Sequence, residues 1–517
     1  MRLFTSLLAA LLALSACSTE STSDPTLIRT SMGEVRGAES GNVRTFQGIP
    51  YGAAGRWEPT RPAAAWQDVR EATKPGNMCP QGGTQYAQTT STTEDCLVLN
   101  VTAPRTATKD TPKPVMVWLH GDGGVGAGHL FDARALAETG DVVVVTVNYR
   151  LGIFGNFSMP GLDVPGSFGL MDQQEAMRWV RREIGAFGGK ADNVTLFGES
   201  YGALSASAHL VSPPARGLFD RVILQSGFAM MDMPAGSLLP DLEAQPWWGW
   251  RSAEEQSQVA AASIPQLGCA DVKCLRDLPA DKLFGLMQPF QSFAYGNQIL
   301  PKLPAQAFTE GDFNPVPVLM GATRDEHRGF TGLFFDLLGT PVTAEQYPRL
   351  LDKAFGDRAA EVAREYPLTS FESPSIAWAA VLTDRMWARS TERFAQAVAK
   401  RTGVHFYEFT DRAAPSFLPF PPSFPTGAYH AADLPYVFPD EEFTAKSAPE
   451  QKELSGRMIR YWAGFAHRGD PNGDGLPAWP AFGGSGHVQS LGTGPSGVGP
   501  TDYRATHKLD FWDRMPG

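Results

Sequence analysis

The residues with the clearest chemical potential are five consecutive ones, Gly198-Glu199-Ser200-Tyr201-Gly202. An apolar run precedes them at residues 194–197, and an alanine-rich stretch follows at residues 203–210. A strand, a sharp turn and a helix in this order predict a nucleophile elbow, which lifts a serine hydroxyl out of the end of a sheet. Glycines flank the serine because so tight a turn accepts only small side chains there. Unpaired N–H groups at the start of the following helix would favour negative charge beside Ser200.

A second candidate is the glycine-rich stretch His120-Gly121-Asp122-Gly123-Gly124. It follows residues 115–119, an apolar run typical of a strand that is buried on both faces. Such a loop can bind a phosphate or can build an oxyanion hole. No Gly-Lys-Ser or Gly-Lys-Thr closes the motif, which excludes the common phosphate-binding loop. The pattern H-G-x-G after an early strand instead fits the oxyanion loop that accompanies a nucleophile elbow.

Composition limits the other function classes. The chain has 517 residues, of which 43% are hydrophobic, so it can bury a large core, and we find no linker that divides its body. The net charge of −11 argues against a nucleic-acid-binding surface. The nine histidines and the acidic residues show no metal-ligand spacing such as H-E-x-x-H. We therefore expect no nucleic-acid partner, no metal and no cofactor.

The middle of the chain alternates between strand-like and helix-like segments. Strands are predicted at residues 97–101, 115–119, 142–147, 194–197, 222–226, 316–321 and 405–409, and helices at 171–184, within 343–400 and at 454–467. This alternation is typical of an α/β fold with a largely parallel sheet and helices on both faces. Residues 228–315 lose the rhythm, and we interpret them as an insertion over the sheet edge. The tryptophans at 247–250 predict either a binding surface or a packed helical excursion.

The N-terminus predicts export. Arg2 supplies a positive charge, and residues 3–14 form an apolar segment too short to remain as a membrane span. The next residues, Leu14-Ser15-Ala16-Cys17, resemble a bacterial lipoprotein processing box. This resemblance implies a signal peptide at residues 1–16 and a lipid on the thiol of Cys17; an ordinary secretory signal cut nearby is the alternative.

Residues 17–26 are rich in serine and threonine and predict a flexible tether. We expect a periplasmic or outer-membrane-anchored lipoprotein whose membrane contact is made only through this anchor, or alternatively a secreted protein. Export also affects the remaining cysteines, because an oxidising compartment allows two disulfides among them. Proximity in sequence favours the pairs Cys79–Cys96 and Cys269–Cys274, with four buried thiols as the alternative.

Several stretches, in order along the chain, resemble the type-B carboxylesterases of the α/β-hydrolase fold, which include bacterial para-nitrobenzyl-type esterases, fungal lipases and cholinesterases. They are residues 46–51, 94–101, 147–152, 187–202, 224–227, 324–326, 429–431 and 469–473. The resemblance covers nearly the whole chain after the tether. It implies a single catalytic domain over residues 27–517, with a large, mostly parallel central sheet flanked by helices and with helical insertions over an active-site gorge.

The resemblance also implies a catalytic triad. Ser200 would be the nucleophile, His430 the general base, and Glu326, rather than Asp325, the acid that orients the histidine. Without the resemblance, Asp325 and Glu326 could be a solvated turn pair. Several other histidines are candidates for purely structural roles: His120, His129, His209 and His327.

Backbone N–H groups would form the oxyanion hole, contributed by Asp122, Gly123 and Tyr201. Glu199 and Ser226 occupy positions where the family has residues that support the triad, although Ser226 could also be an ordinary hydroxyl at a strand end.

Three residues depart from the family pattern. Tyr201 replaces an alanine or glycine after the nucleophile, Asp122 replaces a glycine in a loop that is one residue shorter, and His327 replaces a glycine after the triad acid. A carboxylate near an oxyanion is unfavourable unless it points away. We interpret the three changes as reshaping the pocket rather than abolishing activity.

These features predict an exported serine carboxylic ester hydrolase that acts on a small-molecule ester through an acyl-enzyme. The Cys79–Cys96 loop contains no tryptophan to stack on a quaternary ammonium, which favours a general carboxylesterase over a choline-ester specialist. Alternatives are a lipase, a specialised natural-product or xenobiotic esterase, and a non-catalytic binding protein of the same fold. The loop at residues 415–425 and the tryptophans at 247–250 predict an apolar gorge wall. The sequence makes no prediction of oligomeric state.

Overall fold

The computed structural model describes residues 24–84, 87–162, 164 and 166–515. The predicted signal peptide, Cys17 and most of the predicted tether lie outside the described residues. No helix within these described ranges is both long and apolar enough to cross a membrane.

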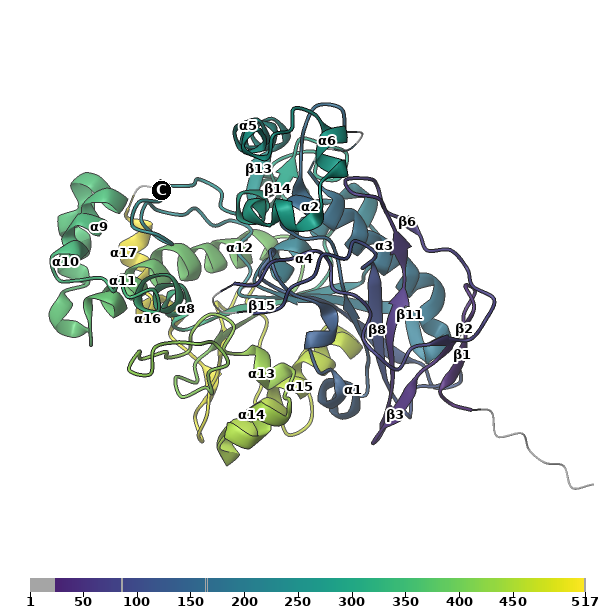
Figure 1. Ribbon diagram of the computed structural model, residues 1–517. Coiled ribbons are helices and arrows are strands. Elements are labelled where there is room, and N and C mark those ends of the chain that lie inside the picture. The colour runs from purple at the N-terminus through teal and green to yellow at the C-terminus, as the bar shows by residue number, and fades with distance from the viewer. Residues whose placement is uncertain (1–23, 85–86, 163, 165, 516–517) are drawn as a thin grey trace, which may run out of the picture.

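A large twisted sheet forms the centre of the molecule (Figure 1). Within the described residues it has eleven strands in the spatial order β18-β17-β16-β15-β12-β11-β9-β10-β8-β4-β3. From β17 to β10 in this order neighbouring strands are parallel, whereas β18 and the strands from β8 to β3 pair antiparallel. The strands are β3 (Ala38–Ser40), β4 (Val43–Pro50), β8 (Val98–Pro104), β9 (Lys113–Leu119), β10 (Val143–Val147), β11 (Gly189–Glu199), β12 (Arg221–Gln225), β15 (Val318–Thr323), β16 (Val404–Phe409), β17 (Val488–Leu491) and β18 (Val498–Pro500).

Helices cover both faces of this sheet because the central strands carry apolar side chains on both faces. Met116 and Trp118 of β9 belong to a core shared with α1 (Arg134–Gly140) and α15 (Pro449–Arg468). The intervening Val115, Val117 and Leu119 belong to the core on the other face, shared with α3 (Phe168–Glu183), α4 (Tyr201–Val211) and α12 (Arg389–Ala399). A strand whose side chains are apolar on both faces is the expected centre of such a layered fold. The predicted α/β architecture is therefore confirmed.

Element boundaries differ modestly from those predicted. The helix expected at residues 171–184 begins three residues earlier as α3, and Ile184 starts a short 3₁₀ turn, Ile184–Phe187, that ends at Gly188 in the left-handed conformation. The region 343–400 holds four α-helices, namely α9 (Gln346–Phe355), α10 (Ala359–Glu365), α11 (Pro374–Leu382) and α12. A glycine with positive φ, Gly356, separates the first two.

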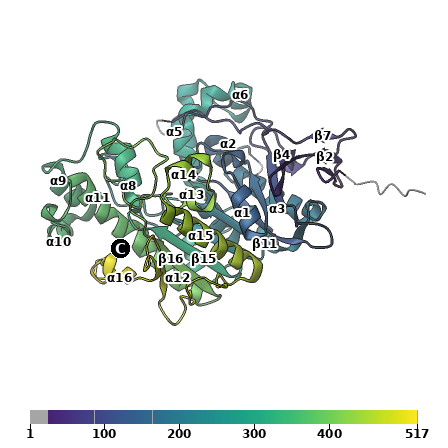
Figure 2. The ribbon, with the colours of Figure 1, turned by 90° about the horizontal axis from the view of Figure 1, so that it is seen from below.

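Residues 228–315 depart from the strand-helix alternation, as expected. They contain β13 (Trp250–Ser252), β14 (Phe293–Tyr295), α5 (Ala253–Ser263), α6 (Val272–Asp277) and α7 (Pro304–Glu310). Figure 1 shows β13, β14, α5 and α6 gathered in a small lobe beside α2 (Gly152–Asn156). In Figure 1 the strands β1 (Leu27–Arg29) and β2 (Glu34–Arg36) lie at one end of the molecule and α9 and α10 at the other, and Figure 2 shows the same separation of β2 from α9 and α10.

The remaining α-helices and β-strands are short. They are β5 (Gly52–Ala53), β6 (Arg61–Pro62), β7 (Arg70–Glu71), α8 (Glu326–Thr331), α13 (Leu434–Val437), α14 (Glu441–Lys446), α16 (Tyr503–Thr506) and α17 (Leu509–Asp513).

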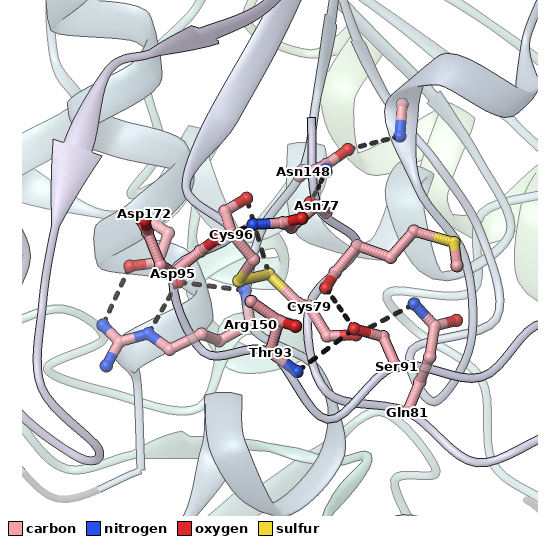
Figure 3. Close-up of a disulfide and its surroundings, with 12 residues drawn as sticks. Asn77, Cys79, Gln81, Ser91, Thr93, Asp95, Cys96, Asn148, Arg150 and Asp172 are labelled. Atoms are coloured by element: carbon pink, nitrogen blue, oxygen red, sulfur yellow. Dashed lines mark hydrogen bonds and ion pairs between the residues drawn. A yellow bond between two sulfur atoms is a disulfide. The ribbon is translucent and has the colours of Figure 1, made fainter. Parts of the chain in front are cut away.

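Two pairs of cysteines are joined. The sulfur atoms of Cys79 and Cys96 are 2.00 Å apart, and those of Cys269 and Cys274 are 1.99 Å apart. Figure 3 shows the first pair among polar side chains that bind the backbone in and beside the enclosed loop. There Asn148 donates to the carbonyl of Asn77 over 2.8 Å.

The loop closed by Cys79 and Cys96 is also fastened to the glycine-rich segment. The side-chain oxygen of Gln81 accepts a hydrogen bond from the N–H of Gly126 over 2.7 Å, and the side-chain nitrogen donates to the Gly126 carbonyl over 3.0 Å. Gly126 has φ +149°, and a Cβ there would lie 2.5 Å from Nδ1 of His120, so only glycine fits. The disulfide loop thus helps to hold the glycine-rich segment in place.

Replacing Cys79 and Cys96 together by alanine should lower the free energy of unfolding by about 3 kcal/mol. Replacing Cys269 and Cys274 together by alanine should lower it by about 2 kcal/mol. The difference follows from loop length, because the first disulfide spans 17 residues and the second spans 5. Thermal unfolding of both double variants, with and without a reductant, measures these losses. Equal melting temperatures of the first variant and the oxidised wild type would contradict the prediction.

Candidate active site

The elbow around Ser200 has the geometry that its sequence predicts. Strand β11 ends at Glu199 and helix α4 begins at Tyr201, so Ser200 alone makes the turn. Its φ and ψ angles are 54° and −121°. A non-glycine residue in such a conformation carries strain of about 1–3 kcal/mol and persists only where its surroundings hold it.

The flanking glycines allow the turn to pack closely. A Cβ at Gly202 would lie 1.9 Å from the carbonyl oxygen of Leu119, and a Cβ at Gly198 would lie 2.5 Å from the carbonyl carbon of Gly202. Neither position has room for a side chain. The elbow therefore presses directly on the end of β9, where the glycine-rich segment begins.

Three polar side chains meet above this turn. Nε2 of His430 lies 2.8 Å from Oγ of Ser200, and Nδ1 lies 2.6 Å from Oε2 of Glu326. Glu326 is fully buried, and its other oxygen accepts a hydrogen bond from the N–H of Thr323 over 2.8 Å. Because Nδ1 faces a carboxylate, it carries the hydrogen, and Nε2 is left to accept one from the serine hydroxyl.

The neighbouring Asp325 has a different task. Its carboxylate accepts hydrogen bonds from Nε and Nη2 of Arg412, over 2.8 and 2.6 Å, and from the N–H of Ala428 over 3.0 Å. Ala428 lies two residues before His430. Asp325 thus fastens the loop that carries the histidine, while Glu326 contacts the imidazole itself.

A second carboxylate faces the histidine. Oε1 of the buried Glu199 lies 3.3 Å from Nε2 of His430. Burial lowers the pKa of His430, but Glu199 and Glu326 outweigh this effect and raise the pKa to about 9. Burial raises the pKa of Glu199 above that of a free carboxyl group, whereas the positive charge of a protonated His430 opposes that shift. A negative Glu199 and a positive His430 therefore stabilise each other.

Ser226 lies at the end of β12 and has a positive φ of 50°. Its hydroxyl is buried and makes no hydrogen bond with any described residue. Ser226 directly follows Gln225, which pairs with Glu199 between β12 and β11, but its hydroxyl is not joined to Glu199 or His430 by a hydrogen bond.

The acidic side chain of the glycine-rich segment, Asp122, binds backbone N–H groups of the same segment. Oδ1 of Asp122 accepts hydrogen bonds from the N–H groups of Gly124 and Val125, over 2.9 and 3.0 Å. Asp122 has φ 75°, and the N–H of Gly123 donates to the carbonyl of Gly121 over 3.1 Å. This bond engages one of the three N–H groups predicted to form the oxyanion hole, so that N–H group must be shared or released when a substrate binds.

Tyr201 packs against the glycine-rich segment and lines the cavity beside Ser200. Its ring centroid lies 4.7 Å from that of Phe293, and its hydroxyl accepts a hydrogen bond from Nδ2 of Asn156 over 2.8 Å. A Cβ at Gly123 would lie 2.7 Å from the ring. The large side chain after the nucleophile is accommodated because position 123 is a glycine.

Sequence patterns did not reveal the aromatic enclosure of His430. The rings of Phe330 and Trp387 each lie 4.9 Å from the imidazole, between centroids. Trp387 comes from the region between α11 and α12, and no local motif marks it.

His327 holds the tryptophan of this enclosure. Its Nε2 lies 2.9 Å from the carbonyl of Ser237 and therefore carries the hydrogen, so its Nδ1 accepts from Nε1 of Trp387 over 3.3 Å. Burial lowers the pKa of His327 to about 4, which keeps the ring neutral. The histidine that follows Glu326 thus positions an aromatic neighbour of His430.

A cavity of about 1120 Å³ opens above Ser200. The predicted apolar wall contributes to it through Trp248 and through residues 415–418, whereas Trp250 is buried outside the lining. Further apolar lining residues are Leu204, Phe228, Leu238, Phe330 and Leu333. Within the described ranges no group of three His, Cys, Asp or Glu side chains is arranged to hold a metal ion.

Comparison with known proteins assigns the family. A family model described as "Carboxylesterase family" matches residues 24–512. The chain belongs to the carboxylesterase family. It is 33% identical to the cocaine esterase of Homo sapiens, over 94% of this chain and 89% of that protein, and 34% identical to the para-nitrobenzyl esterase of Bacillus subtilis (strain 168), over 88% and 92%. A solved PNB esterase structure superposes with a TM-score of 0.74 at 30% identity, covering 95% of this chain and all of that one.

Carboxylesterases hydrolyse ester bonds, and the chain is therefore a carboxylesterase of the α/β-hydrolase fold. The three departures from the family pattern all have partners in this structure: Asp122 binds its own loop, Tyr201 binds Asn156, and His327 binds Trp387. None of these side chains comes between Ser200 and His430, which lie within hydrogen-bonding distance.

In this carboxylesterase, Glu199→Gln should move the acidic limb of the pH dependence of kcat/KM to lower pH, by about one unit. His430 accepts a proton only as the neutral imidazole, and the negative charge of Glu199 raises the pKa of His430. Removing that charge lowers the pKa, so the neutral imidazole persists at lower pH. Ester hydrolysis measured across the pH range tests this. Glu254→Gln, at an exposed site, is the matched control, and coincident limbs for all three proteins would contradict the prediction.

Proposed function

We propose that the protein is an exported serine carboxylic ester hydrolase that works through an acyl-enzyme, with Ser200, His430 and Glu326 as its triad. The observation that carries this proposal is the unbroken chain of short contacts from Oγ of Ser200 through the imidazole to the buried carboxylate, 2.8 and 2.6 Å long. This arrangement is the one by which a serine hydroxyl becomes a nucleophile near neutral pH.

The reaction proceeds in two proton-coupled halves. His430 removes the hydroxyl proton as Oγ attacks the ester carbonyl, and the tetrahedral intermediate collapses when the imidazolium returns that proton to the departing alcohol. Water then attacks the acyl-enzyme, gives its proton to His430, and the acid leaves as Oγ of Ser200 is reprotonated. Glu326 fixes the tautomer and stabilises the imidazolium in both halves.

The oxyanion hole would use backbone N–H groups. That of Tyr201 lies at the first turn of α4, where no helical acceptor is available to it. The N–H groups of Asp122 and Gly123 would complete the site, the latter by exchanging its contact with Gly121 for the developing oxyanion. The acidic side chain of Asp122 is held by Gly124 and Val125, which supports this use of its backbone.

The size and apolar lining of the cavity support a small-molecule ester as substrate. The similar proteins named for cocaine and for para-nitrobenzyl esters support a specialised or xenobiotic esterase as a variant of the same proposal. A lipase would be distinguished by faster hydrolysis of emulsified long-chain esters than of soluble short-chain ones.

Ser200→Ala should reduce release of 4-nitrophenol from its short-chain esters by about 10⁴-fold or more, because the nucleophile is removed. An organophosphate should label the wild-type protein once and leave the variant unlabelled. Ser370→Ala, at an exposed site, is the matched control and should retain full activity. Equal turnover by wild type and Ser200→Ala would overturn the proposed mechanism.

We further propose that residues 1–16 are a signal peptide, that Cys17 carries a lipid and that residues 17–26 tether a single catalytic domain at 27–517. The two joined cysteine pairs support passage through an oxidising compartment. Expressed in a bacterium with lipoprotein processing, the mature protein should begin at Cys17 with an added diacylglycerol mass.

Mass spectrometry of the N-terminal peptide tests the anchor, and Cys17→Ser should release the protein from the membrane fraction. An unmodified Cys17 in the mature wild-type chain would show that the protein is secreted without an anchor.

A further inference from the structure

One cation that lines the cavity, Arg251, has no anionic partner within the part of the chain that the structure describes. Arg251 is the middle residue of β13, and the residues on either side of it are engaged elsewhere. Trp250 is buried and donates from Nε1 to the carbonyl of Ala229 over 2.7 Å, while Ser252 caps the N-terminus of α5. Because side chains alternate across a strand, Arg251 projects away from both neighbours, and it lines the same cavity as Ser200.

The guanidinium is anchored by one edge only. Its Nη1 donates to Oε1 of Gln256 over 3.1 Å and to the carbonyl of Pro289 over 2.8 Å. Among the described residues Arg251 forms no ion pair, and its Nε and Nη2 groups make no hydrogen bond. These two nitrogens lie on the edge of a guanidinium that matches a carboxylate in a bidentate contact.

The surroundings do not neutralise this charge. Burial lowers the pKa of Arg251, and Glu255 is the nearby carboxylate that opposes the shift. Glu255 itself is exposed and accepts a hydrogen bond from the N–H of Ser252 in the capping box of α5. A partly buried cation without a counter-ion is unfavourable until an anion approaches it.

Hydrogen-bond donors continue from Arg251 toward the elbow. Gln288 and Gln291 line the same cavity. A Cβ at Gly124 would lie 2.9 Å from Nε2 of Gln291, so this amide reaches the glycine-rich segment beside Ser200. By contrast Lys446, the other lysine or arginine of the lining, is paired with Glu442 over 2.5 Å. The wall with Arg251, Gln288 and Gln291 therefore offers positive charge and amide donors. The carboxylate of Asp122 lies beside Gln291 but accepts hydrogen bonds from the N–H groups of Gly124 and Val125. The other acidic lining residues are Asp132, Glu199, Asp440 and Glu442, and much of the remaining lining is apolar.

We propose that Arg251, with Gln288 and Gln291, forms an anion-binding subsite, and that it selects ester substrates that carry a carboxylate at the end remote from the reacting ester. The inference rests on the proposed esterase function and deepens it by naming a substrate class. The apolar lining would hold the carbon chain between the two ends.

The test compares pairs of 4-nitrophenyl esters that differ only in a terminal carboxylate, such as hexanoate with the monoester of adipate, and longer homologues. The readout is the ratio of kcat/KM for the carboxylate ester to that for the neutral ester. Arg251→Gln should lower this ratio about tenfold or more, chiefly through KM, and Arg251→Lys should restore part of it because the charge returns. Arg349→Gln, on the exposed face of α9, is the matched control and should leave the ratio unchanged.

Added salt should reduce the wild-type ratio and leave that of Arg251→Gln almost constant, since screening acts only on the charge interaction. An unchanged ratio in Arg251→Gln, or an equal loss for both esters, would overturn the subsite and assign Arg251 a structural role.

A binding measurement distinguishes failure of the proposed esterase mechanism from failure of the proposed subsite. Calorimetric titration of Ser200→Ala protein with monomethyl adipate measures the subsite without turnover, and the Ser200→Ala, Arg251→Gln double variant should bind about tenfold more weakly or worse. If the wild-type protein hydrolyses neither ester, the proposed function fails, but the titration still shows whether Arg251 binds the carboxylate. Equal affinity of the two variants would overturn it.

Discussion

The close approach of Gly202 to the end of β9 governs the geometry of the whole site. With no side chain at position 202, the first turn of α4 comes so near to Leu119 that a Cβ would overlap its carbonyl oxygen. Gly198 and Leu119 are paired in register between parallel strands, so the elbow and the glycine-rich segment leave the sheet at the same edge. Gly121 then packs against Glu199 and Ser200. The nucleophile and the N–H groups proposed to receive the oxyanion are therefore positioned by one packing contact.

Site residues from distant segments of the chain are held in position beside the elbow by separate polar contacts. Asp325 and Glu326 are adjacent in sequence, yet one binds Arg412 and Ala428 and the other binds the imidazole of His430. The strand end at β15 thus supplies both the carboxylate that contacts the histidine and the carboxylate that holds its loop. Gln81, which lies in the loop closed by Cys79 and Cys96, similarly holds the glycine-rich segment through its hydrogen bond with Gly126. Loops are the least constrained parts of a fold, and each of these is held by polar contacts that are at least partly buried.

Local sequence predicts those features that local physics determines. The apolar runs of β9 and β11, and the glycines on either side of Ser200, constrain the backbone by themselves, and the predicted strands and elbow lie within a few residues of the observed ones. The start of α3 was less predictable because no side chain caps it. Trp387 and Arg251 could not be assigned to the site at all, since their roles arise from contacts across the fold. The unusual residue at 327 was visible in the sequence, but its bond to Trp387 was not.

The charges in the cavity serve two opposing requirements. An imidazolium forms on His430 during ester hydrolysis, and the carboxylates of Glu199 and Glu326 stabilise it. The same negative charges repel the oxyanion and any anionic substrate, so hydrogen-bond donors must lie elsewhere in the cavity. The elbow and the glycine-rich segment can supply backbone N–H groups for the oxyanion. The insertion that contains β13 adds Arg251 on a different wall, where Glu255 is the only carboxylate with a marked effect on its pKa among the described groups. Because the negative and positive charges lie on different walls of the cavity, the site can stabilise the imidazolium and still admit an anion. Residues 228–315 supply the positive charge through Arg251.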